Sequence, residues 1–441
     1  MLISHAKKLA GEVSVPGDKS ISHRAVILGS IASGVTEIRH FLLSADCLAT
    51  IDCFQKMGIE IVGRGEVGKD EKVVIRGRGM RGLREPSRTL QAGNSGTTLR
   101  LLTGLLAPQR FTSRIDGDES LRRRPMNRII EPLSLMGGSV QAIGRGGCAP
   151  VIIHGNPLIG LHYESPVASA QVKSSILLAG LYADGETTVT EPGPSRNHTE
   201  LMLRSFGQPV QTNGSTVTLR PEYHLQGREV TVPGDISSAA CFAAAGLIIR
   251  GSELCLKNVG VNPTRSGFLK VCEQMGAKIT RENERTSAGE PSADLIVKSS
   301  SLTGIEIGGD LIPTLIDELP ILAVLACFAS GTTVIKDASE LKVKETNRID
   351  AMVENLKRLG ADIEATEDGM VIHGGRPLKG TALDSRGDHR VAMACAVAAL
   401  AASGDSEIAG AECVEVSYPA FFDDLKKLIQ DPDKPAPAPK A

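Results

Sequence analysis

Six apolar stretches recur along the chain and give its clearest structural signal. Each opens with small or polar residues that suit a helix N-terminus, and most of them end at glycine. Because Ala, Leu and Ile fill the stretches without leaving a polar face, they predict helices that are buried on all sides. The stretches, which start 67 to 80 residues apart, begin at Val15, Gln91, Ser165, Val232, Ile312 and Asp384.

A second, more mixed helix is predicted after each of the first five stretches. Short β-rich runs such as IEIV at 59–62 and AKIT at 277–280 follow it directly. The repeat therefore combines helices and strands, and the predicted fold class is α/β, with the apolar helices packed inside a shell of sheets. A solenoid is the alternative, but solenoid repeats are shorter, about 20–50 residues. The mixed helices end at Gly58, Gly137, Gly207, Gly276 and Gly360.

The string VPGD occurs twice, at 15–18 and at 232–235, which divides the chain into two halves of three units each. We expect the chain to cross between the halves near these two points and to form a hinge there, whose closure excludes water from a site. The tail at 431–441 is rich in Pro and Ala, has nothing to bury and is expected to be disordered. The expected domains are a C-terminal one of residues 1–16 plus 235–430 and an N-terminal one of residues 17–234.

Composition and charge narrow the class of protein. Hydrophobic residues make up 41% of the chain, which is enough for buried cores. The 49 Lys and Arg residues balance 51 acidic residues, so no global field favours nucleic acid or an anionic membrane. The chain has no signal-peptide pattern and no apolar run of roughly 18 residues, which predicts a cytoplasmic protein. Nine scattered cysteines indicate neither a metal site nor a disulfide framework.

Polar residues collect where the predicted buried helices of the first half begin. Lys19 and Ser20 precede Arg24 by about one turn, GNSGT at 93–97 is a glycine-rich turn, and SAQ at 169–171 opens the third helix. A helix N-terminus offers N–H groups and a positive dipole end, both of which favour phosphate or carboxylate. Each motif is weak alone, because many loops look similar.

The second half carries charged residues at similar places. Asp317 and Glu318 precede an apolar helix, where a carboxylate could simply cap the helix. Lys344 and Arg348 are four residues apart, which would put them on one helical face with Glu345 alongside, although such runs are usually solvated faces. The run DHR at 388–390 sets an arginine before an Ala-rich helix, and RRR at 122–124 could bind an anion or be solvated. Cations or hydrogen-bond donors thus stand at the starts of most of the six repeated units, and this shared position favours binding of small phosphorylated anions.

The motifs VPGDKSISHR, GNSGTTLR, RRRPM, SAQVKSS, VKETNR and GDHRVAM, in this order, resemble 5-enolpyruvylshikimate-3-phosphate (EPSP) synthases over nearly the whole chain. The resemblance implies a two-domain inside-out α/β barrel, in which each domain has three repeated helix and strand units with buried helices. It implies transfer of the enolpyruvyl group of phosphoenolpyruvate to the 5-hydroxyl of shikimate 3-phosphate, with release of phosphate. It calls for no cofactor and no metal, and we expect a monomer.

The resemblance also implies the site residues. Those that bind shikimate 3-phosphate would be Lys19, Ser20, Arg24, Ser169, Ala170, Gln171 and Arg196. Those that hold phosphoenolpyruvate would be Lys19, Gly96, Arg124, Arg348 and Arg390, and Lys344 would contact the region of the 5-hydroxyl. Asp317 is the candidate base for the hydroxyl, Glu345 the candidate for proton transfer at the methylene carbon, and Lys19 would stabilise charge on the leaving phosphate.

One departure from the family pattern concerns the C-terminal region. Some members carry a lysine before the aromatic-Pro pair, but here VSYPAFF has Val416 and Ser417. The strings GDKS, SAQVK, RNHTE and NPTR resemble the branch called class II, whose members tend to resist glyphosate. Gly96 complicates that expectation, because alanine at this position is a common route to resistance. We expect partial tolerance.

Three other classes of protein compete with this interpretation. UDP-N-acetylglucosamine enolpyruvyl transferases share the chemistry but typically carry a cysteine in the loop that corresponds to GDESLRRRPM, which has none here. A binding-only protein would bind the substrate without releasing phosphate. A nucleic-acid end-processing enzyme is disfavoured, because the chain lacks net positive charge and has 13 aromatic residues for stacking.

Overall fold

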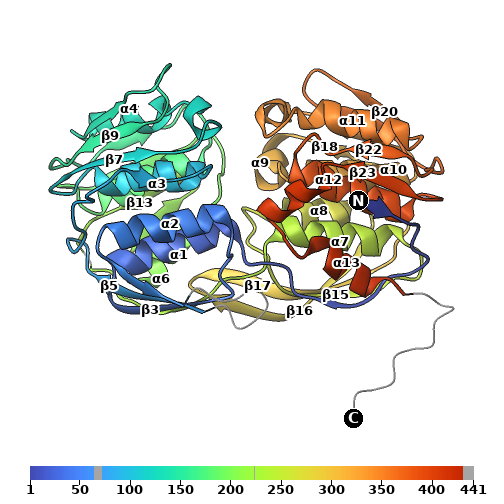
Figure 1. Ribbon diagram of the computed structural model, residues 1–441, viewed down its shortest axis with the longest axis horizontal. Coiled ribbons are helices and arrows are strands. Elements are labelled where there is room, and N and C mark those ends of the chain that lie inside the picture. Colours follow the sequence, from blue (N-terminus) through green and yellow to red (C-terminus); the bar gives the residue numbers. More distant parts are fainter. Residues whose placement is uncertain (64–71, 223, 431–441) are drawn as a thin grey trace, which may run out of the picture. The chain divides into compact units, whose positions relative to one another are not determined.

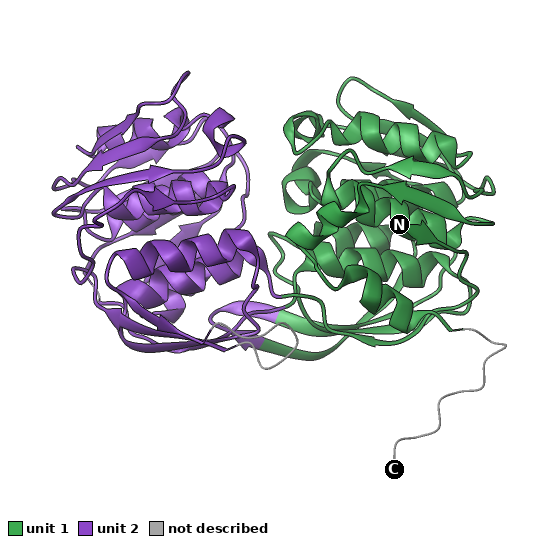
Figure 2. Ribbon diagram, viewed as in Figure 1, with its two compact units in different colours: residues 1–16, 234–285, 292–441 green, residues 17–233, 286–291 purple. Residues whose placement is uncertain are grey.

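The computed structural model describes the whole chain except residues 64–71, residue 223 and residues 431–441 (Figure 1). The expected disorder of the tail therefore lies outside the described residues. The chain forms two compact units, coloured separately in Figure 2. Unit 1 comprises 1–16, 234–285 and 292–441, and unit 2 comprises 17–233 and 286–291. Each unit has a hydrophobic core of its own.

The elements of unit 2 follow the repeat in the sequence. Its helices are α1 (Lys19–Ile31), α2 (Ala45–Lys56), α3 (Gly96–Leu106), the 3₁₀ helix η1 (Leu121–Arg123), α4 (Asn127–Leu135), α5 (Ala170–Gly180) and α6 (His198–Ser205). Its strands are β3 (Ser33–Arg39), β4 (Glu60–Val62), β5 (Lys72–Arg78), β6 (Leu90–Gln91), β7 (Thr112–Asp116), β8 (Ser139–Ala142), β9 (Val151–His154), β10 (His162–Glu164), β11 (Thr187–Thr190), β12 (Val210–Asn213), β13 (Thr216–Leu219) and β14 (Glu229–Thr231).

Unit 1 contains both ends of the described chain. Its helices are α7 (Ile236–Ile248), α8 (Gly267–Gln274), η2 (Gly309–Leu311), α9 (Ile312–Leu315), α10 (Leu319–Phe328), η3 (Ser339–Val343), α11 (Arg348–Arg358), α12 (His389–Ala401), η4 (Ala411–Val416) and α13 (Phe421–Leu428). Its strands are β1 (Leu2–Ile3), β2 (Ala10–Val13), β15 (Glu253–Gly260), β16 (Lys278–Ser287), β17 (Glu290–Lys298), β18 (Glu306–Ile307), β19 (Thr332–Ile335), β20 (Asp362–Ala365), β21 (Met370–His373), β22 (Ala382–Asp384) and β23 (Ser406–Ala409). The tip of the β16–β17 hairpin, residues 286–291, is counted with unit 2.

One sheet topology recurs through both units. The described residues form six small sheets, and five of them have four strands. In each of these five an edge strand runs parallel to the strand that follows the buried helix, as β6 does to β7, and two antiparallel strands complete the sheet in the order β6-β7-β9-β8. The protein is therefore a mixed α/β fold with mixed sheets, and the helix and strand repeat expected from the sequence is confirmed.

The repeated apolar helices form the cores. Every residue from Ile21 to Ile31 of α1 is buried, and all but the last residue of α7 is buried. In unit 1, α7, α10 and α12 pack against one another, and in unit 2, α3 packs against α1 and α5. Figure 1 shows α1 and α2 lying side by side in unit 2. Burial on all sides follows from the uniformly apolar sequence of these helices.

The fifth repeat departs from a single helix. Pro313 and Pro320 stand in the first turns of two separate helices, α9 and α10, and Asp317 lies in the turn between them. The two helical segments 309–315 and 319–328 are bent relative to each other at the break between them. As a pair, they are long and apolar enough to cross a membrane, by length and composition only. Within the described residues no single helix is long and apolar enough to do so.

Candidate functional site

Lys19 lies in the first turn of α1, where the sequence predicts it. Asp18 caps this helix, because its Oδ1 accepts the Ile21 N–H at 2.9 Å. The Lys19 ammonium is half exposed and lies 3.1 Å from Asp46 Oδ2 in α2. An accessible cation thus stands next to a helix N-terminus, and both features attract anions.

Arg24 lies one turn further along α1 and is buried. Its Nε donates to Thr199 Oγ1 at 2.7 Å, its Nη2 to Ser174 Oγ at 2.8 Å and its Nη1 to the Ser20 carbonyl at 3.0 Å. Burial lowers the pKa of Arg24 to about 10, so the group stays charged at neutral pH. Arg24 therefore ties α1 to α5 and α6 and contributes its positive charge from inside the unit.

Gly96 is the first residue of α3, and two arginines lie against it. A Cβ at position 96 would meet Arg100 Nη1 at 3.1 Å and Arg124 Nη1 at 3.4 Å. Arg100 Nη1 donates to Gln171 Oε1 at 2.5 Å, and Arg124 Nη2 donates to Asn94 Oδ1 at 2.7 Å. The structure thus brings Gly96, Arg124 and Gln171 together, and it adds Arg100, a residue that the sequence interpretation did not single out.

The start of α5 is held by a glutamate. Ser169 is the N-cap of this helix, and its backbone N–H donates to Glu191 Oε1 at 2.8 Å. Glu191 Oε2 accepts the Ser195 hydroxyl at 2.7 Å, next to Arg196. Ala170 is the first helical residue, so the predicted SAQ motif does open a helix. Glu191 consequently joins the N-terminus of α5 to the loop that carries Arg196.

Below the start of α5, Lys173 forms a buried ion cluster with two glutamates. Lys173 Nζ lies 2.8 Å from Glu191 Oε2 and 2.8 Å from Glu200 Oε1, and all three side chains are at most 4% exposed. One cation therefore serves two buried carboxylates within the core of unit 2. Such charges are tolerated in a protein interior only when they are paired.

In unit 1, the buried side chain of Arg348 is surrounded by carboxylates. Its guanidinium is 2% exposed and contacts three carboxylates. Nε donates to Asp388 Oδ2 at 2.8 Å, Nη2 to Glu345 Oε2 at 2.6 Å and Nη1 to Asp317 Oδ1 at 3.4 Å. Burial alone would lower the pKa of Arg348, but the three carboxylates outweigh it and raise that pKa above its usual value.

Glu345 and Lys344 precede α11, which begins at Arg348. The expectation that Lys344 and Arg348 share one helical face is therefore wrong, because η3 ends at Val343 and the chain is extended at Lys344. Lys344 Nζ instead donates to Glu340 Oε1 at 2.7 Å. Burial opposes ionisation of Glu345, but Arg348 lowers the pKa of this carboxyl below its ordinary value.

Arg390 is mostly buried and lies in the first turn of α12. Its Nη2 lies 3.6 Å from Oδ2 of Asp235, the N-cap of α7. Arg390 and Arg265 outweigh burial and lower the pKa of the Asp235 carboxyl. Burial, with Arg390 beside it, lowers the pKa of His389 to about 4, so this imidazole is neutral at pH 7.

Glu318 does not cap α10, which was the simple alternative for this residue. It pairs with Arg265, whose Nη1 lies 3.0 Å and 2.8 Å from the two Glu318 carboxylate oxygens. Asp317 next to it is 21% exposed, so it remains accessible to a ligand.

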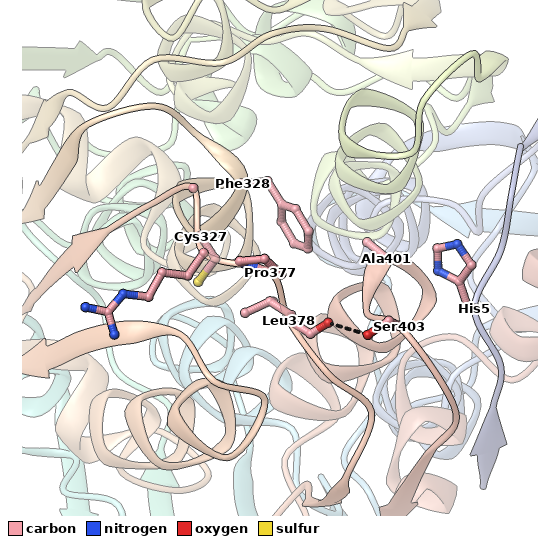
Figure 3. Close-up of a pocket in the computed structure, with 9 residues that line it drawn as sticks. His5, Cys327, Phe328, Pro377, Leu378, Ala401 and Ser403 are labelled. Carbon is pink, nitrogen blue, oxygen red and sulfur yellow. Dashed lines mark hydrogen bonds between the residues drawn. The ribbon is translucent and has the colours of Figure 1, made fainter.

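A surface pocket of about 370 Å³ lies elsewhere in unit 1 (Figure 3). Its labelled walls include Phe328, Pro377, Leu378 and Ala401, and the Ser403 hydroxyl donates to the Leu378 carbonyl. None of the expected site residues lines it. Its mainly apolar wall is unsuited to a phosphorylated anion.

Sequence reasoning missed several residues of these clusters, although it quoted the motifs that contain them. Arg100 stands four residues after Gly96 and so on the same face of α3. Asp388 belongs to GDHRVAM, and Arg265 belongs to NPTR. The sequence could have indicated Arg100, because an arginine four residues after a glycine at a helix start lies on the same face of the helix. Nothing local signalled that Arg265 would meet Glu318.

Cations at helix N-termini and carboxylates held beside buried arginines are features of a class, the α/β enzymes that bind small anions and transfer protons. The sequence profile of the EPSP synthase (3-phosphoshikimate 1-carboxyvinyltransferase) family matches residues 3–425. The chain belongs to this family, and it acts as a 3-phosphoshikimate 1-carboxyvinyltransferase in the shikimate pathway.

Relatives match over nearly their full length. The 3-phosphoshikimate 1-carboxyvinyltransferase of Geobacillus kaustophilus is 56% identical over 97% of this chain and 100% of its own. That of Thermoanaerobacter sp. is 54% identical over 94% of this chain and 96% of its own. A solved structure of EPSP synthase from Acinetobacter baumannii has a TM-score of 0.90 and 46% identity, with 97% of each chain covered.

Proposed function

We propose that the chain performs this transfer in two steps, an addition and then an elimination. The 5-hydroxyl oxygen of shikimate 3-phosphate adds to C2 of phosphoenolpyruvate, and the methylene carbon C3 takes up a proton. The resulting tetrahedral intermediate then loses a proton from the new methyl group while its C–O bond to phosphate breaks. The products are the enolpyruvyl ether and inorganic phosphate, so atoms and charges balance without a redox partner.

Shikimate 3-phosphate is held by the helix starts of unit 2. Lys19 and Ser20 open α1, and Ser169, Ala170 and Gln171 open α5. Their backbone N–H groups and positive helix ends complement a phosphate dianion. Arg24 and Arg196 add positive charge, Arg24 from its buried position.

Phosphoenolpyruvate is held by cations and by one backbone N–H group. In unit 2, the Gly96 N–H and Arg124 contact it, with Lys19 at its phosphate. In unit 1, Arg348 and Arg390 contact it, and Lys344 lies at the 5-hydroxyl. Arginine suits planar carboxylates and phosphates because its donors form a rigid fork.

Asp317 takes the proton of the 5-hydroxyl, and Glu345 moves the proton to and from C3. The observation that carries this assignment is the Arg348 cluster, in which one buried guanidinium contacts both carboxylates. An arginine that binds phosphoenolpyruvate would thereby set the two proton-transfer groups beside the reacting carbons. Lys19 and the arginines stabilise charge on the departing phosphate.

Phosphate release tests this assignment. The purified protein is given phosphoenolpyruvate with shikimate 3-phosphate and, separately, with UDP-N-acetylglucosamine. We expect release with shikimate 3-phosphate alone, and a fall in kcat of about 10²–10⁴ in Asp317→Ala, Glu345→Gln and Lys19→Ala. Asp52→Ala removes a partly exposed carboxylate of unit 2, whose Oδ2 lies 2.7 Å from Lys56 Nζ, and serves as the control. Wild-type kcat in Asp317→Ala would remove Asp317 as the base.

We also propose that the chain belongs to the class II branch and is partly tolerant of glyphosate. The strings GDKS, SAQVK, RNHTE and NPTR support this, and Val416 with Ser417 stands where some members carry a lysine. Glyphosate titration of phosphate release provides the test. Inhibition as strong as in a glyphosate-sensitive EPSP synthase assayed alongside would reject the proposal.

We propose that the three repeats of each half close into an inside-out α/β barrel, with domains of residues 1–16 plus 235–430 and 17–234. The shared order of the five four-stranded sheets and the burial of the repeated helices support it. An experimental structure with different closure of the sheets would contradict it.

A further inference from the structure

Arg265 is a buried arginine beside the candidate base, and it has no part in the reaction described so far. It lies between β15 and α8 and is 6% exposed. Its Nη2 lies 3.9 Å from Asp317 Oδ2 and 3.8 Å from Asp235 Oδ1. We propose that Arg265 is a positioning residue, which holds the Asp317 carboxylate in the orientation that accepts the proton of the substrate hydroxyl. The proposal rests on the role of Asp317 given under Proposed function.

The position of Arg265 is itself tightly determined. Its Nη1 lies 3.0 Å and 2.8 Å from the two oxygens of Glu318, whose side chain is completely buried. Its Nη2 donates to the Ser237 hydroxyl, and that hydroxyl donates to Glu318 Oε1. A guanidinium fixed by a buried carboxylate and a buried hydroxyl has little freedom to rotate. It can therefore act as a rigid support.

The two oxygens of Asp317 face different guanidinium groups. Oδ1 accepts from Arg348 Nη1 at 3.4 Å, and Oδ2 lies 3.9 Å from Arg265 Nη2. Arg348 approaches from the start of α11, and Arg265 approaches from the segment before α8. Contacts to both oxygens limit rotation of the carboxylate plane, which one contact would leave free. A proton acceptor held in one orientation reacts faster than a mobile one, because the geometry for transfer is already formed.

The placement of Glu318 supports the same conclusion. It stands at the N-cap position of α10 but makes no capping hydrogen bond with its side chain. A carboxylate next to a helix start would normally cap the helix or remain in solvent. Here it is buried against Arg265, which brings this cation beside the neighbouring residue Asp317. The simpler alternative is that the pair only stabilises unit 1.

Kinetics of substituted proteins separate positioning from stabilisation. Arg265→Gln/Glu318→Gln removes both charges of the buried pair, and Arg265→Lys keeps the charge but loses the fork. We expect kcat of the double variant to fall by about 10–100-fold, with KM for both substrates within about twofold of the parent. Arg265→Lys should lose between about threefold and tenfold in kcat, because an ammonium cannot contact Glu318 and Asp317 in the same way. Arg358→Met, which removes an exposed arginine paired with Glu354 on α11, is the control and should keep both constants.

Each outcome decides the proposal. A folded double variant with kcat within about twofold of the parent would make Arg265 purely structural. If the double variant does not fold by circular dichroism, Arg265→Lys decides, and unchanged kcat in that variant overturns the proposal. Asp317→Asn is measured in parallel. If it keeps wild-type kcat, the base assignment fails independently of Arg265.

Discussion

At the scale of single residues, Gly96 is notable because its missing side chain leaves room for two cations. We predict that Gly96→Ala raises KM for phosphoenolpyruvate by about tenfold and leaves KM for shikimate 3-phosphate within about twofold. The added Cβ would lie 3.1 Å from Arg100 Nη1 and 3.4 Å from Arg124 Nη1, so one guanidinium has to move. Steady-state phosphate release measures both constants. Gly93→Ala tests loop strain separately, because Gly93 has a φ of 58° and open space around its Cα. Equal KM changes for both substrates would contradict the prediction for Gly96.

His23 gives a prediction about pH. Burial lowers its pKa from the ordinary histidine value of about 6.5 to about 3, and its Nδ1 lies 2.7 Å from Thr50 Oγ1. Its folded-state pKa is depressed, so the unfolded chain binds the proton more readily, and stability is lost as pH falls from about 6.5 towards 3. Between pH 7.5 and pH 5 the wild type should lose about 2 kcal/mol more than His23→Gln in urea unfolding. His162→Gln, at an exposed position in β10, should behave like the wild type.

At the scale of elements, the Lys173 cluster decides how α5, α6 and the segment after β11 are held together. Lys173→Met leaves Glu191 and Glu200 buried without their shared cation. We predict a loss of about 3–5 kcal/mol in the free energy of unfolding, measured by urea titration. Lys56→Met breaks a partly exposed pair within α2 and should cost less than about 1 kcal/mol. Similar losses in the two variants would show that burial of the cluster is not the decisive factor.

At the scale of the whole molecule, the two hydrophobic cores are separate, and unit 2 is nearly continuous in sequence. We predict that a fragment of residues 17–233 folds cooperatively and binds shikimate 3-phosphate but releases no phosphate. It keeps the α1, α3 and α5 starts and lacks Asp317, Glu345, Arg348 and Arg390. It also lacks Glu290, whose Oε1 lies 2.8 Å from His198 Nδ1, so we expect it to be less stable than the full chain. Circular dichroism and calorimetric titration are the measurements. A folded fragment without affinity would contradict the assignment of this substrate to unit 2.

Much of the fold and of the candidate site follows from local sequence. The apolar runs predict α1, α7 and α12, because uniformly apolar helices have to be buried. The capping residues predict where helices begin, and Asp18, Ser95, Ser169, Asp235 and Asp388 each accept a hydrogen bond from the first turn that follows. Charges at those starts predict anion binding, because the exposed N–H groups and the helix dipole are properties of the terminus itself.

Other features depend on contacts between residues that are distant in sequence. Strand β14 pairs with β3, nearly 200 residues earlier, and no local pattern specifies that pairing. The pairing of Arg265 with Glu318, and the contacts of Arg348 with Asp317 and Asp388, likewise join separate repeats. By itself the sequence determined most of the segments that form helices, the helix starts at which we expect anions to bind, and the family that the chain resembles. Only the tertiary structure decided which charges meet, because buried ion pairs depend on distances and orientations that packing sets after the elements have formed.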